Sequence, residues 1–340
     1  MNSLKMQFVL IALTCIVLSV LVIPLTSRFS STDPFVAIEY VIPEQQKSVN
    51  FARVETGFIV TDVLDFDTRE NEFKVDAVIW FSFDPSKISL ETIDKFTFLN
   101  GSIESKSAPS TELLHNRILA KYSIRVSFST VLDYKLFPVD DHRIVLTLVN
   151  KQVSPDEMIY EVKGADFIVS SQIRVHGWEF CDKYVEYGYI EIKIQKGKVI
   201  QYPVVVFELD FKKIGFGGVM PVFVPLMIMF FMAMICFSLI AIGRSDAALS
   251  ISLANESVMI GYLFVLQNLV PRVGYFTFAN YIFVFVFMVS FLALTISIFV
   301  YKTKKVPRWL YWFNNIVVPL LYLLLFVIVY IFLYVFPEGI

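Results

Sequence analysis

Four long apolar stretches in the last third of the chain constrain its fold more than any other feature. Charged residues are absent from 214–243, 273–301 and 309–337, and a fourth stretch, 247–270, is interrupted only by Glu256. Each is longer than the roughly 20 residues that cross a bilayer as a helix. Charged residues make up only 18% of the chain, which is low for a soluble protein. We therefore predict a membrane protein whose residues 214–340 form an all-α bundle of four transmembrane helices.

Basic residues in the connections predict the orientation of these helices. Residues 302–308 between the last two stretches carry four lysines and arginines, and Arg244 lies between the first two stretches. By the positive-inside rule both connections are cytoplasmic. An even number of spans then places residues 30–213 and the C-terminus outside. We expect a multi-pass protein of the cell membrane with an extracellular or periplasmic N-terminal domain.

The first 29 residues have the form of an export signal. Lys5 precedes an apolar run over 8–25, as in a secretory signal peptide. No small-residue cleavage site of the usual type follows, so an uncleaved N-terminal anchor is the alternative. Between these two, we favour a cleaved signal peptide that takes no part in the working structure.

Residues 30–213 alternate apolar and polar side chains in short runs. Apolar residues at 124, 126 and 128, and again at 190, 192 and 194, are separated by polar ones. This period of two is typical of strands with one buried face. Polar turn clusters separate the runs, and only 89–95 looks helical. We predict an antiparallel, immunoglobulin-like β-sandwich over this region.

The sequence gives no support for enzyme chemistry. Three scattered cysteines form neither a disulfide framework nor a CxxC metal motif, and the three histidines have no ligand spacing. Nucleophile-elbow, zinc-protease and phosphate-loop motifs are absent. The net charge of -2 does not favour nucleic acid as a partner. We expect no catalytic residues, no metal and no cofactor.

Five segments, taken in order, resemble the pentameric ligand-gated ion channels, or Cys-loop receptor superfamily. "LDYKLFPVDDHRIVLTLV" (132–149) is similar to the aromatic-Pro-x-Asp loop of that family. "AVIWFSFDP" (77–85) and "GWEF" (177–180) resemble its tryptophan-bearing elements, and we interpret both tryptophans as core residues. "YPVVVFELDFKK" (202–213) is similar to its last strand, with Lys212 or Lys213 in place of the usual arginine. "NLVPRVGY" (268–275) is similar to the link after its pore helix.

The resemblance covers 35–335 and implies a prokaryotic-type member, because the bracketing cysteines are missing and the third connection is short. It implies a homopentamer in which a ligand of the sandwich opens a pore along the second transmembrane helix. Residues implied to couple the two domains are Phe137, Pro138, Asp140, Lys213, Pro271 and Arg272. The alternative function is a membrane-anchored solute sensor that does not conduct.

The family's ligand pocket lies between subunits, behind a hairpin whose tip here is expected at 196–198. Candidate ligand-binding residues are Phe96, Lys151, Tyr189 and Tyr202. Lys151 stands where the family often has an aromatic residue, which weakens the case for an amine ligand. The agonist, a small molecule or a proton, therefore stays unassigned.

The expected pore helix carries one stripe of mostly small or polar residues. At about 100° per residue, these positions share one face, which the resemblance, anchored at Pro271, also selects: Asp246, Ser250, Ala254, Ser257, Gly261, Phe264 and Asn268. We expect Phe264 to form a constriction, and a ring of Asp246 carboxylates to favour monovalent cations. Glu256 falls about 120° away. We favour burial of Glu256 among the helices, with a carboxylate ring in a rotated pore helix as the alternative.

Overall fold

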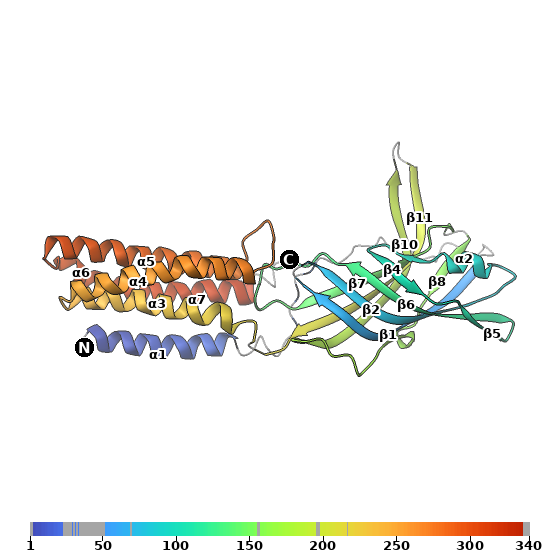
Figure 1. Cartoon of the computed structure of the whole chain (residues 1–340), viewed down its shortest axis with the longest axis horizontal. Helices are drawn as coiled ribbons and strands as arrows, with labels where there is room; N and C mark the ends of the chain where they lie inside the picture. Colours follow the sequence, from blue (N-terminus) through green and yellow to red (C-terminus); the bar gives the residue numbers. More distant parts are fainter. Residues whose placement is uncertain are drawn as a thin grey trace. The chain divides into compact units, whose positions relative to one another are not determined.

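The computed structural model describes residues 3–22, 29, 31, 33, 52–68, 70–154, 157–194, 198–215 and 217–335. The chain divides into two compact units (Figure 1). A helical unit comprises Met1–Thr32, Asp133–Asp141 and Lys213–Ile340, and a β unit comprises Asp33–Leu132 and His142–Lys212. The segment 133–141, which we had expected within the sandwich domain, thus groups with the helices.

The β unit consists of two sheets. The larger sheet has the order β4-β6-β2-β1-β8, with β5 also pairing with β6 and β9 with β1, and the smaller has the order β10-β11-β7-β3. The strands of the larger sheet are β1 (Ala52–Asp67), β2 (Glu72–Phe83), β4 (Gly101–Lys106), β5 (Ser110–Leu114), β6 (Arg117–Ser129), β8 (Met158–Glu161) and β9 (Phe167–Val169). Those of the smaller sheet are β3 (Thr97–Phe98), β7 (His142–Val149), β10 (Trp178–Ile194) and β11 (Lys198–Lys213). The predicted short helix is present as α2 (Leu90–Asp94), and a 3-10 turn follows at η3 (Gly164–Asp166).

Aromatic side chains from both sheets form the core between them. Phe58 of β1 stacks on Phe207 of β11, with ring centroids 4.8 Å apart, and both are fully buried. Along β2 every second residue is buried, as the period of two predicts. The sandwich-like packing of the β unit is therefore confirmed.

Two details of the β unit differ from expectation. The sheets are mixed, because β1 pairs in parallel with β8 and β9 while its pairing with β2 is antiparallel. β8 and β9 thus run in the same direction as β1. The prediction that the sandwich is wholly antiparallel was therefore wrong. Trp80 is also only partly buried, because it lies opposite Gly57 on the outer face of β2. A Cβ at Gly57 would come within 2.2 Å of the Trp80 ring.

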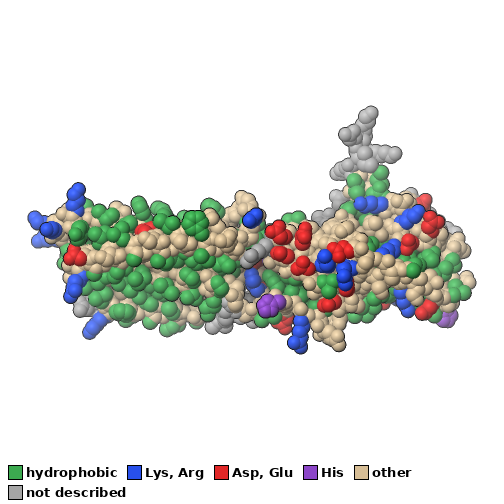
Figure 2. Space-filling view, viewed as in Figure 1, with side chains coloured by type: hydrophobic (Ala, Val, Ile, Leu, Met, Phe, Trp, Pro, Cys, Tyr) green, Lys and Arg blue, Asp and Glu red, His purple; other side chains and the backbone are tan. Residues whose placement is uncertain are grey.

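The helical unit contains five helices that are long and apolar enough to cross a membrane, judged by length and composition over the described residues. They are α1 (Ser3–Val22), α3 (Met220–Ala241), α4 (Ser245–Leu269), α5 (Phe278–Thr303), and a last helical segment made of α6 (Arg308–Trp312), η5 (Phe313–Val317), α7 (Val318–Tyr330) and η6 (Ile331–Val335). Figure 2 shows apolar side chains over these helices and basic ones at the end that carries α6. The chain is thus built as a membrane protein.

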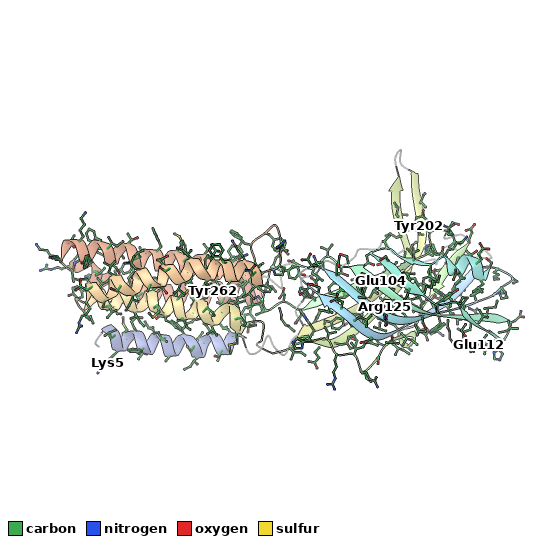
Figure 3. All side chains as sticks on the ribbon, viewed as in Figure 1. Lys5, Glu104, Glu112, Arg125, Tyr202 and Tyr262 are labelled. Carbon is green, nitrogen blue, oxygen red and sulfur yellow. The ribbon has the colours of Figure 1, made fainter. Side chains whose placement is uncertain are left out.

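Helices α3, α4 and α5 pack against one another around a shared apolar core. Tyr262 of α4 ties α4 to the start of α3, because its hydroxyl donates to the carbonyls of Val222 at 2.7 Å and Pro221 at 3.2 Å (Figure 3). α5 begins at Phe278, where the Thr277 side chain caps the helix by accepting from the Asn280 amide. Residues 273–277 belong to the α4–α5 connection, although they are part of the uncharged run 273–301.

Candidate functional site

The loop 133–141 is hydrogen-bonded to the connection before α5 and to the first turn of α5. The Phe278 and Ala279 amides donate to the carbonyls of Lys135 and Phe137, at 2.8 and 3.1 Å. The Tyr275 hydroxyl accepts from the Tyr134 amide at 2.9 Å. Phe137 and Val139 pack against the apolar core of the helical unit. The backbone and the apolar side chains of the loop therefore fix it to the start of α5.

Lys213 is the basic residue that meets this loop. Its ammonium lies 3.5 Å from an Asp140 carboxylate oxygen, 3.3 Å from the Pro138 carbonyl and 5.2 Å from the Phe137 ring centroid. Its backbone amide donates to the Asp141 carboxylate at 2.9 Å. Of the two lysines that the sequence offered, Lys213 therefore joins the predicted coupling residues Phe137, Pro138 and Asp140.

The predicted coupling residues Pro271 and Arg272 lie in the connection after α4. Pro271 is buried and Arg272 is exposed. The Pro271 carbonyl accepts from the Val273 amide at 2.9 Å, which turns the chain after the helix. Both residues therefore belong to the same α4–α5 connection as Tyr275, which contacts the 133–141 loop.

The seven predicted pore positions, from Asp246 to Asn268, are all exposed on α4 in the single subunit. The opposite side of α4 is buried and includes Ala248, Ser252 and Tyr262. Phe264 is 61% exposed although it is large and apolar. In a bilayer, polar side chains that face away from their own bundle are costly unless water or another protein surface meets them.

Glu256 lies at the edge of the buried side of α4. It is partly buried, and its Oε1 atom has no hydrogen-bond partner among the described residues. The side-chain amide of the neighbouring Asn255 donates to the Met229 carbonyl at 3.1 Å and to the Ser290 hydroxyl at 2.8 Å. In the single subunit, Glu256 is therefore beside the bundle core and off the exposed stripe.

The candidate ligand residues Phe96 and Tyr189 are buried in the β unit. Phe96 is 2% exposed and packs against Phe81 and Tyr122, with ring centroids 5.1 and 5.3 Å away. The Lys106 ammonium lies 4.2 Å from the Phe96 ring centroid and pairs with Asp94 at 3.0 Å. A cation of the chain itself therefore already occupies the face of Phe96 that an amine ligand would use. Sequence spacing did not reveal Lys106.

The other two candidates lie in different surroundings. Tyr202 is partly buried against a small apolar cluster of Val145, Val149, Val204 and Val206, at the foot of the β10–β11 hairpin (Figure 3). Lys151 is exposed in the turn after β7. The hairpin tip expected at 196–198 lies outside the described residues, apart from the first residue of β11. The four candidates therefore do not share one environment in a single subunit.

A charged cluster on β7 and β11 escaped the sequence analysis. Arg143 makes two hydrogen bonds to the buried Asp210 carboxylate, at 2.7 and 2.9 Å, and these raise the pKa of Arg143. Glu208 lies 3.6 Å from another Arg143 nitrogen. Burial raises the pKa of the Glu208 carboxyl above its ordinary value. The strand pairing that brings β7 beside β11 was needed to see this cluster.

The raised pKa of Glu208 predicts that the stability of the folded protein depends on pH. Because its pKa is higher in the folded protein, folding is favoured while Glu208 is protonated, and this contribution is lost as the pH rises through the folded pKa. We expect Glu208→Gln to raise the melting temperature of the purified protein at neutral pH, and to change it little below about pH 4. Glu179→Gln, an exposed change on β10, is the matched control. Equal effects of Glu208→Gln at both pH values would contradict this prediction.

Comparison with known proteins gives no further assignment. Neither a protein-family model nor a curated protein matches the chain. The channel resemblance therefore rests on the five segments of the sequence.

Proposed function

We propose that the chain is one subunit of a homopentameric, ligand-gated ion channel of the Cys-loop receptor type. The observation that carries the proposal is the exposed stripe of mostly small or polar residues on α4, which includes Asp246, Ser257 and Asn268. α4 is also the least apolar of the candidate spans. Five copies of the stripe around a common axis would remove its polar groups from lipid and supply a water-filled path.

The proposed gating mechanism uses the loop 133–141. The loop is bonded to the start of α5, and Lys213 meets it where β11 ends and the helical unit begins. A ligand that binds one arrangement of the sandwich better than another shifts the equilibrium by its differential affinity. A small displacement of Lys213 and the loop would then be passed to α5 and to the neighbouring end of α4. The proposed channel lies in the cell membrane, with the β unit and the C-terminus outside.

Ion flux from liposomes that contain the purified protein tests this proposal. We expect flux of monovalent cations that depends on a stimulus found by screening external pH and small molecules. Ser257→Trp should block the flux because it fills the stripe, whereas Ile298→Trp, at an exposed position of α5, should not. Equal flux in both variants would contradict a path along α4, and an absence of flux under every stimulus would favour the non-conducting sensor.

A further inference from the structure

The N-terminal helix α1 turns two of its polar side chains, Gln7 and Thr14, towards the bundle. Gln7 and Thr14 are buried, at 1% and 0% exposure, whereas Phe8, Ile16 and Val20 are 62–64% exposed. Polar residues inside and apolar residues outside are the pattern of a helix packed within a membrane bundle, since lipid meets the outer face.

Specific contacts hold α1 against the rest of the helical unit. The Tyr322 hydroxyl of α7 donates to the Gln7 side-chain oxygen at 3.1 Å, and the Tyr334 hydroxyl of η6 donates to the Leu21 carbonyl at 2.8 Å. Leu10, Ile11, Leu18 and Leu21 pack against the apolar core. Residues 7, 14 and 21 recur every seven positions, which keeps them on one face of a packed helix. α1 contacts both α3 and α7.

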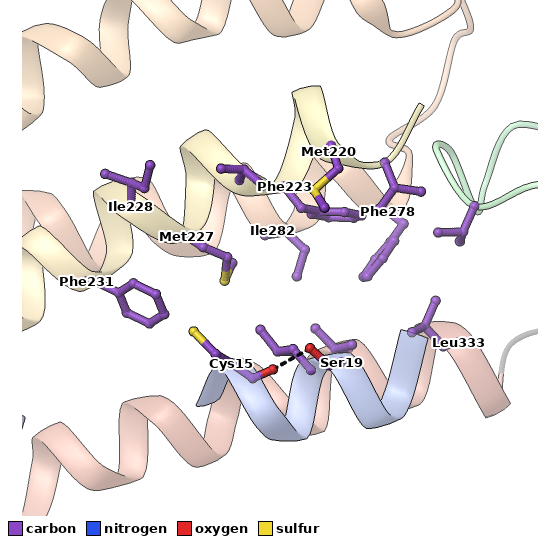
Figure 4. A pocket seen from close by; sticks show the side chains of 15 residues that line it. Cys15, Ser19, Met220, Phe223, Met227, Ile228, Phe231, Phe278, Ile282 and Leu333 are labelled. Atoms are coloured by element: carbon purple, nitrogen blue, oxygen red, sulfur yellow. Dashed lines mark hydrogen bonds between the residues drawn. The ribbon is translucent and has the colours of Figure 1, made fainter. Parts of the chain in front are cut away.

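α1 also forms one wall of a partly open apolar pocket of about 490 Å³ (Figure 4). Cys15, Leu18 and Ser19 of α1 face Phe223 and Met227 of α3 and Phe278 of α5 across it. Without α1 this pocket would lose that wall, and the buried Tyr322 hydroxyl would lose Gln7 as its partner. A bilayer supplies no replacement for that hydrogen bond.

From these contacts we infer that α1 stays in the mature protein as a fifth membrane-spanning helix, seated against α3 and α7, and is not removed as a signal peptide. Lys5, at the start of α1, would remain on the cytoplasmic side. The chain then leaves α1 on the side where the proposed topology places the β unit. This inference does not depend on whether the protein conducts ions.

N-terminal sequencing of the wild-type protein tests retention directly. The protein is purified from membranes through a C-terminal tag, and its intact mass is measured in parallel. We expect the chain to begin at Met1 or Asn2. A mature N-terminus beyond residue 22 would overturn the inference.

A double-mutant cycle tests whether the retained helix occupies the place described. Tyr322→Phe should lower the apparent melting temperature by about 3 °C, because it leaves the buried Gln7 oxygen unpaired. Gln7→Leu should lower it less, since it leaves the Tyr322 hydroxyl unpaired but also removes the buried Gln7 Nε2 atom, which has no partner among the described residues. The double variant should lose less than the sum, since both groups are then removed together. Val20→Ala with Tyr330→Phe, at positions that are 64% and 50% exposed on the same two helices, is the control pair and should be additive. Additive losses for Gln7→Leu and Tyr322→Phe would overturn the placement of α1.

Discussion

Lys213→Ala is expected to shift the activation midpoint of the channel by at least tenfold, for whichever stimulus the flux screen identifies. The Asp140 side chain is 2% exposed, and removing its cationic neighbour leaves a buried carboxylate less well compensated. A tenfold shift corresponds to about 1.4 kcal/mol, which is modest for a buried charge pair. Asp140→Ala should act in the same direction because it removes the other member of the pair.

The control for this prediction is Lys212→Ala, one residue earlier on β11. Lys212 carries the same charge, but the contacts to Asp140, Pro138 and Phe137 belong to Lys213. Surface expression, pentamer formation and single-channel conductance should be unchanged in all three variants. Equal shifts for Lys212→Ala and Lys213→Ala, or normal activation in both Lys213→Ala and Asp140→Ala, would remove the basis of the coupling scheme.

Asp246→Lys is expected to move the reversal potential from the potassium potential towards the chloride potential. Asp246 is exposed in the first turn of α4, where five copies would form a ring of carboxylates at the proposed cytoplasmic mouth. In a tenfold KCl gradient, an ideally cation-selective pore reverses at about 59 mV in magnitude. Reversing the charge of the ring should reduce this value strongly and can change its sign.

Asp246 also has a structural role in its own helix, and the experiment must separate this role from an effect on ion selectivity. A carboxylate in the first turn of a helix is stabilised by the helix dipole, so Asp246→Lys could act through folding alone. Ala247→Lys puts the same charge at the next exposed position of the same turn, off the predicted stripe. It should leave the reversal potential near that of the wild type. A wild-type reversal near the chloride potential would contradict cation selectivity.

The membrane helices could be predicted from the sequence because the cost of burying charge in lipid is large and local. Their ends were less well defined. The uncharged runs begin at 214 and 273, whereas α3 and α5 begin at Met220 and Phe278. A hydropathy pattern does not register a cap such as Thr277. The stripe on α4 was accessible for another local reason, because helical periodicity places its residues on one face and the family resemblance selects the same face.

Long-range contacts were not accessible in this way. The loop 133–141 meets residues about 140 positions later, and periodicity carries no information on that pairing. The same holds for the parallel return of β8 and β9 to β1. The choice between Lys212 and Lys213 also needed coordinates, because adjacent strand residues point to opposite faces and a register shift of one exchanges them.

Block by thiol reagents along α4 tests whether α4 lines an ion path. Cys15, Cys181 and Cys236 are first replaced by serine, and single cysteines are then introduced at 256 and 257. Currents are recorded from single channels while a charged thiol reagent is applied on either side. We expect rapid, irreversible block of Ser257→Cys and no block of Glu256→Cys, whereas block of Glu256→Cys with Ser257→Cys unaffected would rule out this orientation of α4.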